Sequence, residues 1–147
     1  MQVLSRRGSR SAFTLVELLI VIIILAVLAA IAIPRFMDSG IRSKEASLRG
    51  NLKLIRNAVE LFQNDTGAFP SALADLAATT APANGKDTAG ANKSISSGDY
   101  KGPYLQAIPN DPVSGNAFNY STTAGSVGKV TSSASGNGLD GTAYSTW

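Results

Sequence analysis

The longest hydrophobic run of the chain lies near the N-terminus, from Phe13 to Ile33, and contains only two polar residues, Thr14 and Glu17. A helix of about 20 residues, rising about 1.5 Å per residue, crosses a hydrocarbon core of roughly 30 Å. The run therefore predicts a membrane-spanning helix. Glu17 places a carboxylate close to the start of that helix, where a charge requires a partner.

A second hydrophobic pattern follows Pro34, whose ring we expect to kink or interrupt the helix because it blocks a backbone hydrogen bond. Apolar residues then recur at alternating spacings of four and three, which predicts an amphipathic helix over residues 42–64. We expect this apolar stripe to pack on the rest of the domain; it consists of Leu48, Leu52, Ile55, Val59 and Phe62. We expect the opposite face to be solvated, or to meet a neighbour in an assembly; it carries Arg49, Lys53, Arg56 and Glu60.

The hydrophobic pattern changes after Gly67, because glycine is typical of the position just beyond a helix. Pro70 is expected to begin a short second helix, with Leu73 and Leu76 packed inward. Residues 77–99 show no hydrophobic periodicity and are rich in Gly, Ala, Thr and Asn. This composition indicates a long, mobile surface loop.

Two short strands are predicted near the C-terminus, at residues 117–121 and 127–131, around a Thr-Thr-Ala-Gly turn. We expect them to form a small antiparallel sheet that covers the helix stripe. The predicted fold class is therefore α+β. A long N-terminal helix, membrane-spanning in its first half and amphipathic in its second, packs on a small antiparallel β-sheet.

Composition removes several kinds of chemistry. The chain contains neither Cys nor His, which excludes disulfides, thiolate nucleophiles, His-based triads and Cys/His zinc sites. A hard cation held by oxygen ligands is still compatible with the sequence. No catalytic constellation is visible, and we expect a structural protein rather than an enzyme.

The net charge of +3 comes from three arginines that precede the apolar run, Arg6, Arg7 and Arg10. Without them the chain carries equal numbers of basic and acidic residues. The positive charge therefore belongs to a short leader, and no nucleic-acid partner is predicted.

Glu17 has two interpretations. Thr14-Leu15-Val16-Glu17 matches a capping box, in which the glutamate satisfies the first backbone groups of a helix. Alternatively, Glu17 pairs with a positive charge, although no basic side chain lies within the run. A cut between Ala12 and Phe13 would create such a charge, because a free α-amine is mostly protonated at neutral pH.

These residues resemble a known family. Ser-Ala-Phe-Thr-Leu-Val-Glu, followed by the apolar run and Pro34, is similar to the N-terminus of type IV pilins and type II secretion pseudopilins. The resemblance implies that a prepilin peptidase removes residues 1–12 on the cytoplasmic face and methylates the new amine of Phe13. Glu17 then pairs with the Phe13 amine of an adjacent subunit during assembly. Ala12 stands where the family usually has Gly.

The globular part resembles the major pseudopilin of the type II secretion system more narrowly. The similar stretches are "GAFPSALADL" and "GPYLQAIPNDPVSGNAFNY". Those pseudopilins bind calcium in a C-terminal loop, and the resemblance implies Asn137 and Asp140 as candidate calcium ligands here. A plain Asn/Gly/Asp turn is the alternative for these two residues.

The resemblance also implies a cellular setting. The helix of residues 13–33 would span a bacterial inner membrane once, in contact with lipid, and residues 34–147 would form a periplasmic domain. The expected partners are other copies of the chain in a homopolymeric filament, the prepilin peptidase, an inner-membrane assembly platform, and minor pseudopilins or pilins. The filament would lie in the periplasm or at the cell surface.

Three alternatives to a secretion pseudopilin stay open at this point. The chain could be a type IV pilus subunit. It could be a soluble secreted domain, released by signal peptidase after Ala32 in the pattern Ala30-Ile31-Ala32. It could also be a monomer with an uncut signal anchor that retains the three arginines. The first residue of the mature chain distinguishes these options, being Phe13 for a pilin or pseudopilin and Ile33 for the secreted domain.

Overall fold

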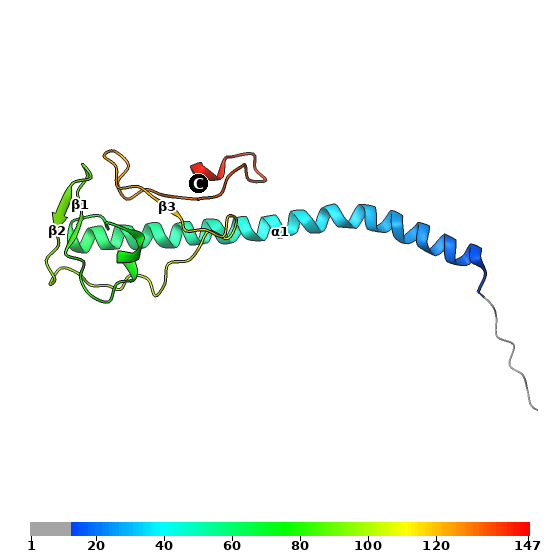
Figure 1. The fold of residues 1–147 in the computed structure, drawn as a ribbon, viewed down its shortest axis with the longest axis horizontal. Coiled ribbons are helices and arrows are strands. Elements are labelled where there is room, and N and C mark those ends of the chain that lie inside the picture. The colour runs from blue at the N-terminus through cyan, green and yellow to red at the C-terminus, as the bar shows by residue number, and fades with distance from the viewer. Residues whose placement is uncertain (1–12) are drawn as a thin grey trace, which may run out of the picture. The chain divides into compact units, whose positions relative to one another are not determined.

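The computed structural model describes residues 13–147, except for the side chains of residues 33–38. The predicted leader of residues 1–12, including Ala12, lies outside the described residues. The chain divides into two units, residues 1–39 and Gly40–Trp147, and the second contains the globular core. One long helix, α1 (Leu15–Thr66), contributes to both units (Figure 1).

The first part of α1 has the length and composition of a membrane span, from Leu15 to Ala32. None of this span is buried by the described residues, 13–147, so these leave its apolar side chains available to lipid or to other helices. The prediction of a membrane-length apolar helix is confirmed.

Pro34 does not interrupt the helix, because α1 continues from Leu15 through to Thr66. The expected break is therefore wrong, while a bend at this position stays a prediction. A proline removes one backbone donor, but the turns on either side can keep their own hydrogen bonds. Helix formation on both sides thus outweighs the loss of a single bond.

The second part of α1 buries the predicted stripe. Leu48, Ile55 and Phe62 are fully inaccessible, and the remaining two members, Leu52 and Val59, are almost so. A buried side chain of this size contributes about 1.5–3 kcal/mol. The stripe is thus the main apolar face around which the globular unit is built.

The end of α1 follows the predicted glycine signal. Gly67 has a φ of 67°, a left-handed conformation that glycine adopts without strain, and its N–H donates to the Gln63 carbonyl at 2.8 Å.

The short helix that follows is a 3₁₀ turn, η1 (Leu73–Ala77), with Leu73 and Leu76 buried as expected. It starts later than Pro70, because the Asp75 carboxylate accepts from the backbone N–H groups of Ser71 and Ala72.

Residues 77–99 are not a structureless loop, which corrects the prediction. They contain a hairpin of β1 (Asn84–Lys86) and β2 (Asn92–Ser94), paired antiparallel with Gly85 opposite Lys93. Lys86 also exchanges two backbone hydrogen bonds with Phe69, at 2.7 and 2.8 Å. The hairpin is thus held mainly by backbone pairing, which leaves no hydrophobic period in the sequence.

The two C-terminal strands occur within the predicted segments but are shorter. β3 (Asn119–Tyr120) pairs antiparallel with β4 (Val130–Thr131), and Val130 is fully buried in the core. A second 3₁₀ turn, η2 (Tyr144–Thr146), completes the chain's elements. β3 and β4 thus form the small antiparallel sheet that the sequence predicted, and the β1–β2 hairpin is a second, separate two-stranded sheet.

Adjacent residues of α1 offer a matched test of this core. Ile55→Ala should lower the free energy of unfolding by about 2–5 kcal/mol, because Ile55 is fully buried. Leu54→Ala should change it by less than about 1 kcal/mol, because Leu54 is 49% exposed. Denaturant unfolding of the full chain in detergent micelles measures both. Equal losses for the two variants would contradict the assignment of the buried face.

Candidate functional site

The N-terminal motif forms a complete capping box at the start of α1. The Thr14 backbone N–H donates to Glu17 Oε2 at 2.9 Å, and the Thr14 hydroxyl donates to the same atom at 3.0 Å. In return, the Glu17 N–H donates to Thr14 Oγ1 at 3.2 Å. The capping interpretation of Glu17 therefore has its expected geometry.

The capping box does not use the whole carboxylate. All hydrogen bonds that Glu17 accepts from the described residues end on Oε2, and none end on Oε1. The side chain is also exposed. Capping and pairing with an external positive group are therefore compatible, since they can use different oxygens of one carboxylate.

The C-terminal loop contains the second predicted site. Asn137 and Ala143 form an isolated backbone bridge, and the Gly138 N–H donates to the Thr142 carbonyl at 2.8 Å. Asp140 lies within this turn, where its Oδ1 accepts from the N–H of Thr142 at 2.9 Å and from its hydroxyl at 2.6 Å. These bonds to Thr142, followed by Arg49, lower the pKa of Asp140.

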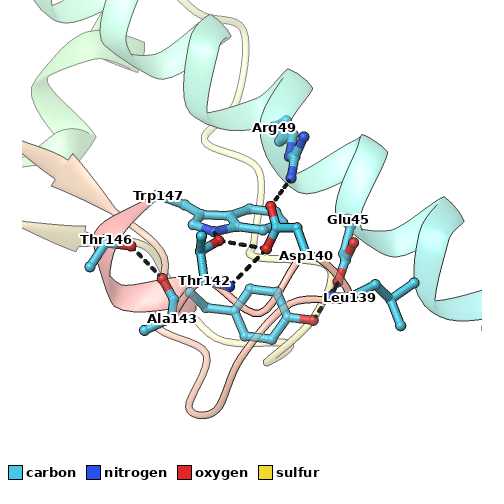
Figure 2. Close-up of polar contacts among 9 residues, drawn as sticks. Glu45, Arg49, Leu139, Asp140, Thr142, Ala143, Thr146 and Trp147 are labelled. Carbon is cyan, nitrogen blue, oxygen red and sulfur yellow. Dashed lines mark hydrogen bonds and ion pairs between the residues drawn. The ribbon is translucent and has the colours of Figure 1, made fainter.

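Arg49 on α1 faces this turn (Figure 2). Its Nη2 lies 2.8 Å from Asp140 Oδ2, and its Cζ lies 4.2 Å from the centroid of the Trp147 ring. The Trp147 Nε1–H donates to the Thr142 hydroxyl oxygen at 2.6 Å. The prediction that Arg49 lies on a solvated face is therefore incomplete, because its guanidinium binds the C-terminal loop.

Glu45, one turn before Arg49, is a buried carboxylate that anchors the same loop. Its Oε1 accepts from the Leu139 N–H at 2.8 Å and from the Tyr144 hydroxyl at 2.9 Å. A Cβ on Gly138 would lie only 3.1 Å from that oxygen and 2.7 Å from Trp147, so glycine permits this close approach. Glu45 and Arg49 together attach the loop to one side of α1.

The geometry bears directly on the calcium prediction for Asn137 and Asp140. Calcium takes six to eight oxygen ligands, usually with several carboxylates. Both oxygens of Asp140 already accept from protein donors, one of them a guanidinium. Within residues 13–147, side chains of 33–38 excepted, no three Asp or Glu side chains are grouped to hold a metal. As arranged, these residues do not fit a calcium ion, and calcium binding stays a prediction that requires Arg49 to leave.

Asp111 is a second buried acid, which the sequence suggested only as part of a turn. It is fully inaccessible, and its Oδ1 accepts from the N–H groups of Val113 at 2.8 Å and Ser114 at 3.2 Å. Its Oδ2 accepts from the Ser132 hydroxyl and the Ser133 N–H. Burial alone raises the pKa of Asp111, but these four hydrogen bonds together hold it below its ordinary value.

The sequence contained a signal for one of the missed residues. Glu45 lies three positions before Leu48 and so continues the spacing of the apolar stripe, which predicts that it faces the core. Arg56 was also assigned to the solvated face, yet its Nε and Nη2 both donate to the Val130 carbonyl. No local pattern distinguishes it from Lys53, because its acceptor is a backbone oxygen 74 residues away.

These features define a class of protein. A capped apolar helix of membrane length continues into an amphipathic helix, which packs on short strand pairs, as in a membrane-anchored subunit with a pilin-like fold. The family profile described as "Prokaryotic N-terminal methylation motif" matches residues 7–33. The profile described as "Type II secretion system (T2SS), protein G" matches residues 35–144. The chain belongs to this protein G family, the major pseudopilins of type II secretion.

Individual relatives agree with this assignment. The type II secretion system core protein G of Pseudomonas aeruginosa is 31% identical over 78% of this chain and 75% of its own length. The core protein G of Aeromonas hydrophila is 30% identical over 73% and 70%. The type IV major pilin of Myxococcus xanthus is 42% identical, but over only 39% of this chain and 26% of the pilin. No solved structure matches the chain significantly.

Membership establishes the general role. The chain is a pseudopilin subunit, and its family consists of structural proteins that form a filament with copies of themselves and with other pseudopilins. The apolar helix is consistent with a membrane anchor.

The pH dependence of folding tests the role of Asp111. Because its pKa is lowered in the folded protein, its stabilising contribution is complete above the ordinary value of 3.8 and is lost as the pH falls through the lowered pKa. Asp111→Asn should lower the free energy of unfolding near pH 7 by about 2–4 kcal/mol. It should also flatten the loss of stability as the pH falls below about 3.8, the ordinary pKa of the group.

Urea unfolding of the full chain in detergent at a series of pH values measures both effects. Asp99→Asn is the control, because Asp99 is exposed. If both variants follow the wild-type pH profile, the Asp111 network does not contribute as described.

Proposed function

We propose that this chain is matured by a prepilin peptidase, which cuts between Ala12 and Phe13 and methylates the Phe13 amine. The mature subunit then polymerises into a helical filament that works as a piston in type II secretion. In this proposal residues 13–33 span the inner membrane and form the filament's helical contacts. Residues 34–147 lie in the periplasm.

The observation that carries this proposal is the geometry of Glu17. Its carboxylate caps α1 through Oε2 and leaves Oε1 without a hydrogen bond from the described residues. A capping role alone would need no charge, since glutamine forms the same box. The free oxygen suits a positive group brought by another molecule, and the amine of Phe13 is such a group after cleavage.

Pairing with this amine would fix the axial position of one apolar helix relative to its neighbour. Lipid tails are as apolar as the span of Leu15–Ala32, so burial against a neighbour gives little preference for one axial position. An ion pair between Glu17 and a neighbouring Phe13 amine fixes that position. The pair also removes the cost of an uncompensated charge at membrane depth.

The same proposal includes the remaining partners. The peptidase exposes the Phe13 amine by cutting the chain, and an inner-membrane assembly platform adds subunits to the filament base. Minor pseudopilins, which share the same kind of N-terminus, join through the same contact. The leader arginines favour a cytoplasmic N-terminus, but five basic residues also follow the span within about twenty positions, so the count of positive charges does not fix the orientation. The proposed periplasmic location therefore rests on the family to which the chain belongs.

A type IV pilus subunit is the second candidate function. Pilin relatives favour it, among them the Myxococcus xanthus pilin and a narrow pilus major component of Thermus thermophilus, 44% identical over 40% of this chain. The protein G relatives cover more of the chain, which favours secretion. A secreted domain released after Ala32 would lose Glu17 altogether, leaving the geometry of the capping box without a role.

Processing gives the first test of this proposal. The chain isolated from membranes of the producing bacterium should begin at Phe13 and carry one methyl group on its amine. Intact mass and N-terminal sequencing measure both properties. A chain beginning at Ile33 would support the secreted domain, and a chain retaining Arg6, Arg7 and Arg10 would support an uncut anchor.

Substitution of Glu17 separates charge pairing from capping. Glu17→Leu should leave membrane insertion intact and cleavage largely so, but abolish filaments, because both the cap and the charge are lost. Glu17→Gln keeps the donor–acceptor pattern of the capping box and removes only the charge. It should therefore also prevent filaments, as seen by electron microscopy of sheared cells overproducing the protein. Wild-type filament numbers with Gln would show that Glu17 is only a helix cap.

A further inference from the structure

The C-terminal loop of residues 136–147 has little regular structure of its own, yet it is closely attached to α1. Its only helical element is the short turn η2, and its main buried side chain is Tyr144, 6% exposed. Side chains of α1 supply the attachment, through the carboxylate of Glu45 and the guanidinium of Arg49. Ordering such a loop costs conformational entropy, which its contacts with α1 must offset.

Arg49 makes two contacts with the loop at once. Its guanidinium lies against Asp140 at 2.8 Å and over the ring of Trp147 at 4.2 Å (Figure 2). A planar, permanently charged guanidinium is suited to this double contact, because it donates in its plane and stacks on its face. Trp147 and Asp140 are joined in turn through the hydroxyl of Thr142.

The carboxylate of the loop already has a positive partner within the chain. Asp140 is the only acidic residue after Asp111, and Arg49 pairs with it. The nearest further acid is Glu45, whose Oε1 is engaged by Leu139 and Tyr144. A divalent cation at Asp140 Oδ2 would meet the Arg49 guanidinium, which already lies 2.8 Å from that oxygen, and like charges repel.

We propose that Arg49 takes the place of a bound cation: its guanidinium, held between Asp140 and Trp147, fixes the C-terminal loop on α1 without calcium. The positive charge needed by the loop carboxylate is thus part of the chain. Folding of the loop is therefore independent of the calcium concentration. The attachment depends on the Arg49 side chain and weakens as salt screens the exposed ion pair. This inference does not depend on filament assembly and applies to the single subunit.

The chain provides its own probe, because Trp147 is the only tryptophan. Its fluorescence reports whether the ring is held against Arg49 and Tyr144, whose ring centroid lies 5.1 Å away. The experiment uses the full chain in detergent micelles and follows Trp147 emission during thermal unfolding. Each sample is measured in chelator and again in millimolar calcium chloride.

The wild-type protein should give the same emission and the same Tm in chelator and in calcium, because no calcium contributes to the folded state. Arg49→Gln should lower the Tm by roughly 2–6 °C and shift Trp147 emission towards that of a solvated ring. Lys53→Gln is the matched control. It removes a positive charge one turn further along α1 that forms no ion pair among the described residues.

A double-mutant comparison isolates the pair. Asp140→Asn should lower the Tm by less than Arg49→Gln, since the Trp147 stack survives. The double variant should lose less than the sum of the two single changes, because the second substitution finds the ion pair already broken.

Two results would overturn the proposal. The first is a wild-type Tm that rises by several degrees in calcium, with the rise abolished by Asp140→Asn, which would make Asp140 a calcium ligand. The second is equal behaviour of the Arg49→Gln and Lys53→Gln variants in Tm and in Trp147 emission, which would leave Arg49 without a special role.

Discussion

Burial of the apolar stripe of α1 is the interaction on which the globular unit depends. The stripe includes Leu48, Ile55 and Phe62, all fully inaccessible, and several other elements pack against it. Val130 of β4 and Leu76 of η1 reach it from segments far apart in the sequence, and the rings of Tyr100 and Tyr104 pack against Phe62. The strands are too short to form an independent sheet, so they are stabilised by the helix they cover.

The two parts of α1 have different surroundings. From Leu15 to Ala32 its side chains are not covered by any part of the chain that the structure describes, and from Leu48 onward one face is covered by the chain's own loops. This division explains why the sequence shows a continuous apolar run in one part and a period of 3.6 in the other. It also explains why these elements were the parts of the fold that could be predicted.

Less of the loop structure could be predicted, and particular residues show why. The β1–β2 hairpin is held by backbone pairing, including that of Lys86 with Phe69, and such bonds leave little trace in side-chain pattern. Asp111 was visible as a turn residue, but its burial depends on Ser132 and Ser133, about twenty residues later. In the candidate site, Thr14 and Glu17 were predictable because a capping box is local. The contact of Arg49 with Asp140 spans 91 positions, and no local rule anticipates it.

The capping box at Thr14 and Glu17 has a consequence for how subunits are exchanged. Because the first turn of α1 is closed by bonds within one chain, the helix does not need a neighbour in order to begin. A subunit in the lipid bilayer and a subunit in a filament can then have the same first turn. Under the proposed pairing they differ in whether Glu17 Oε1 has a partner, and this first turn does not have to refold when a subunit joins or leaves a filament.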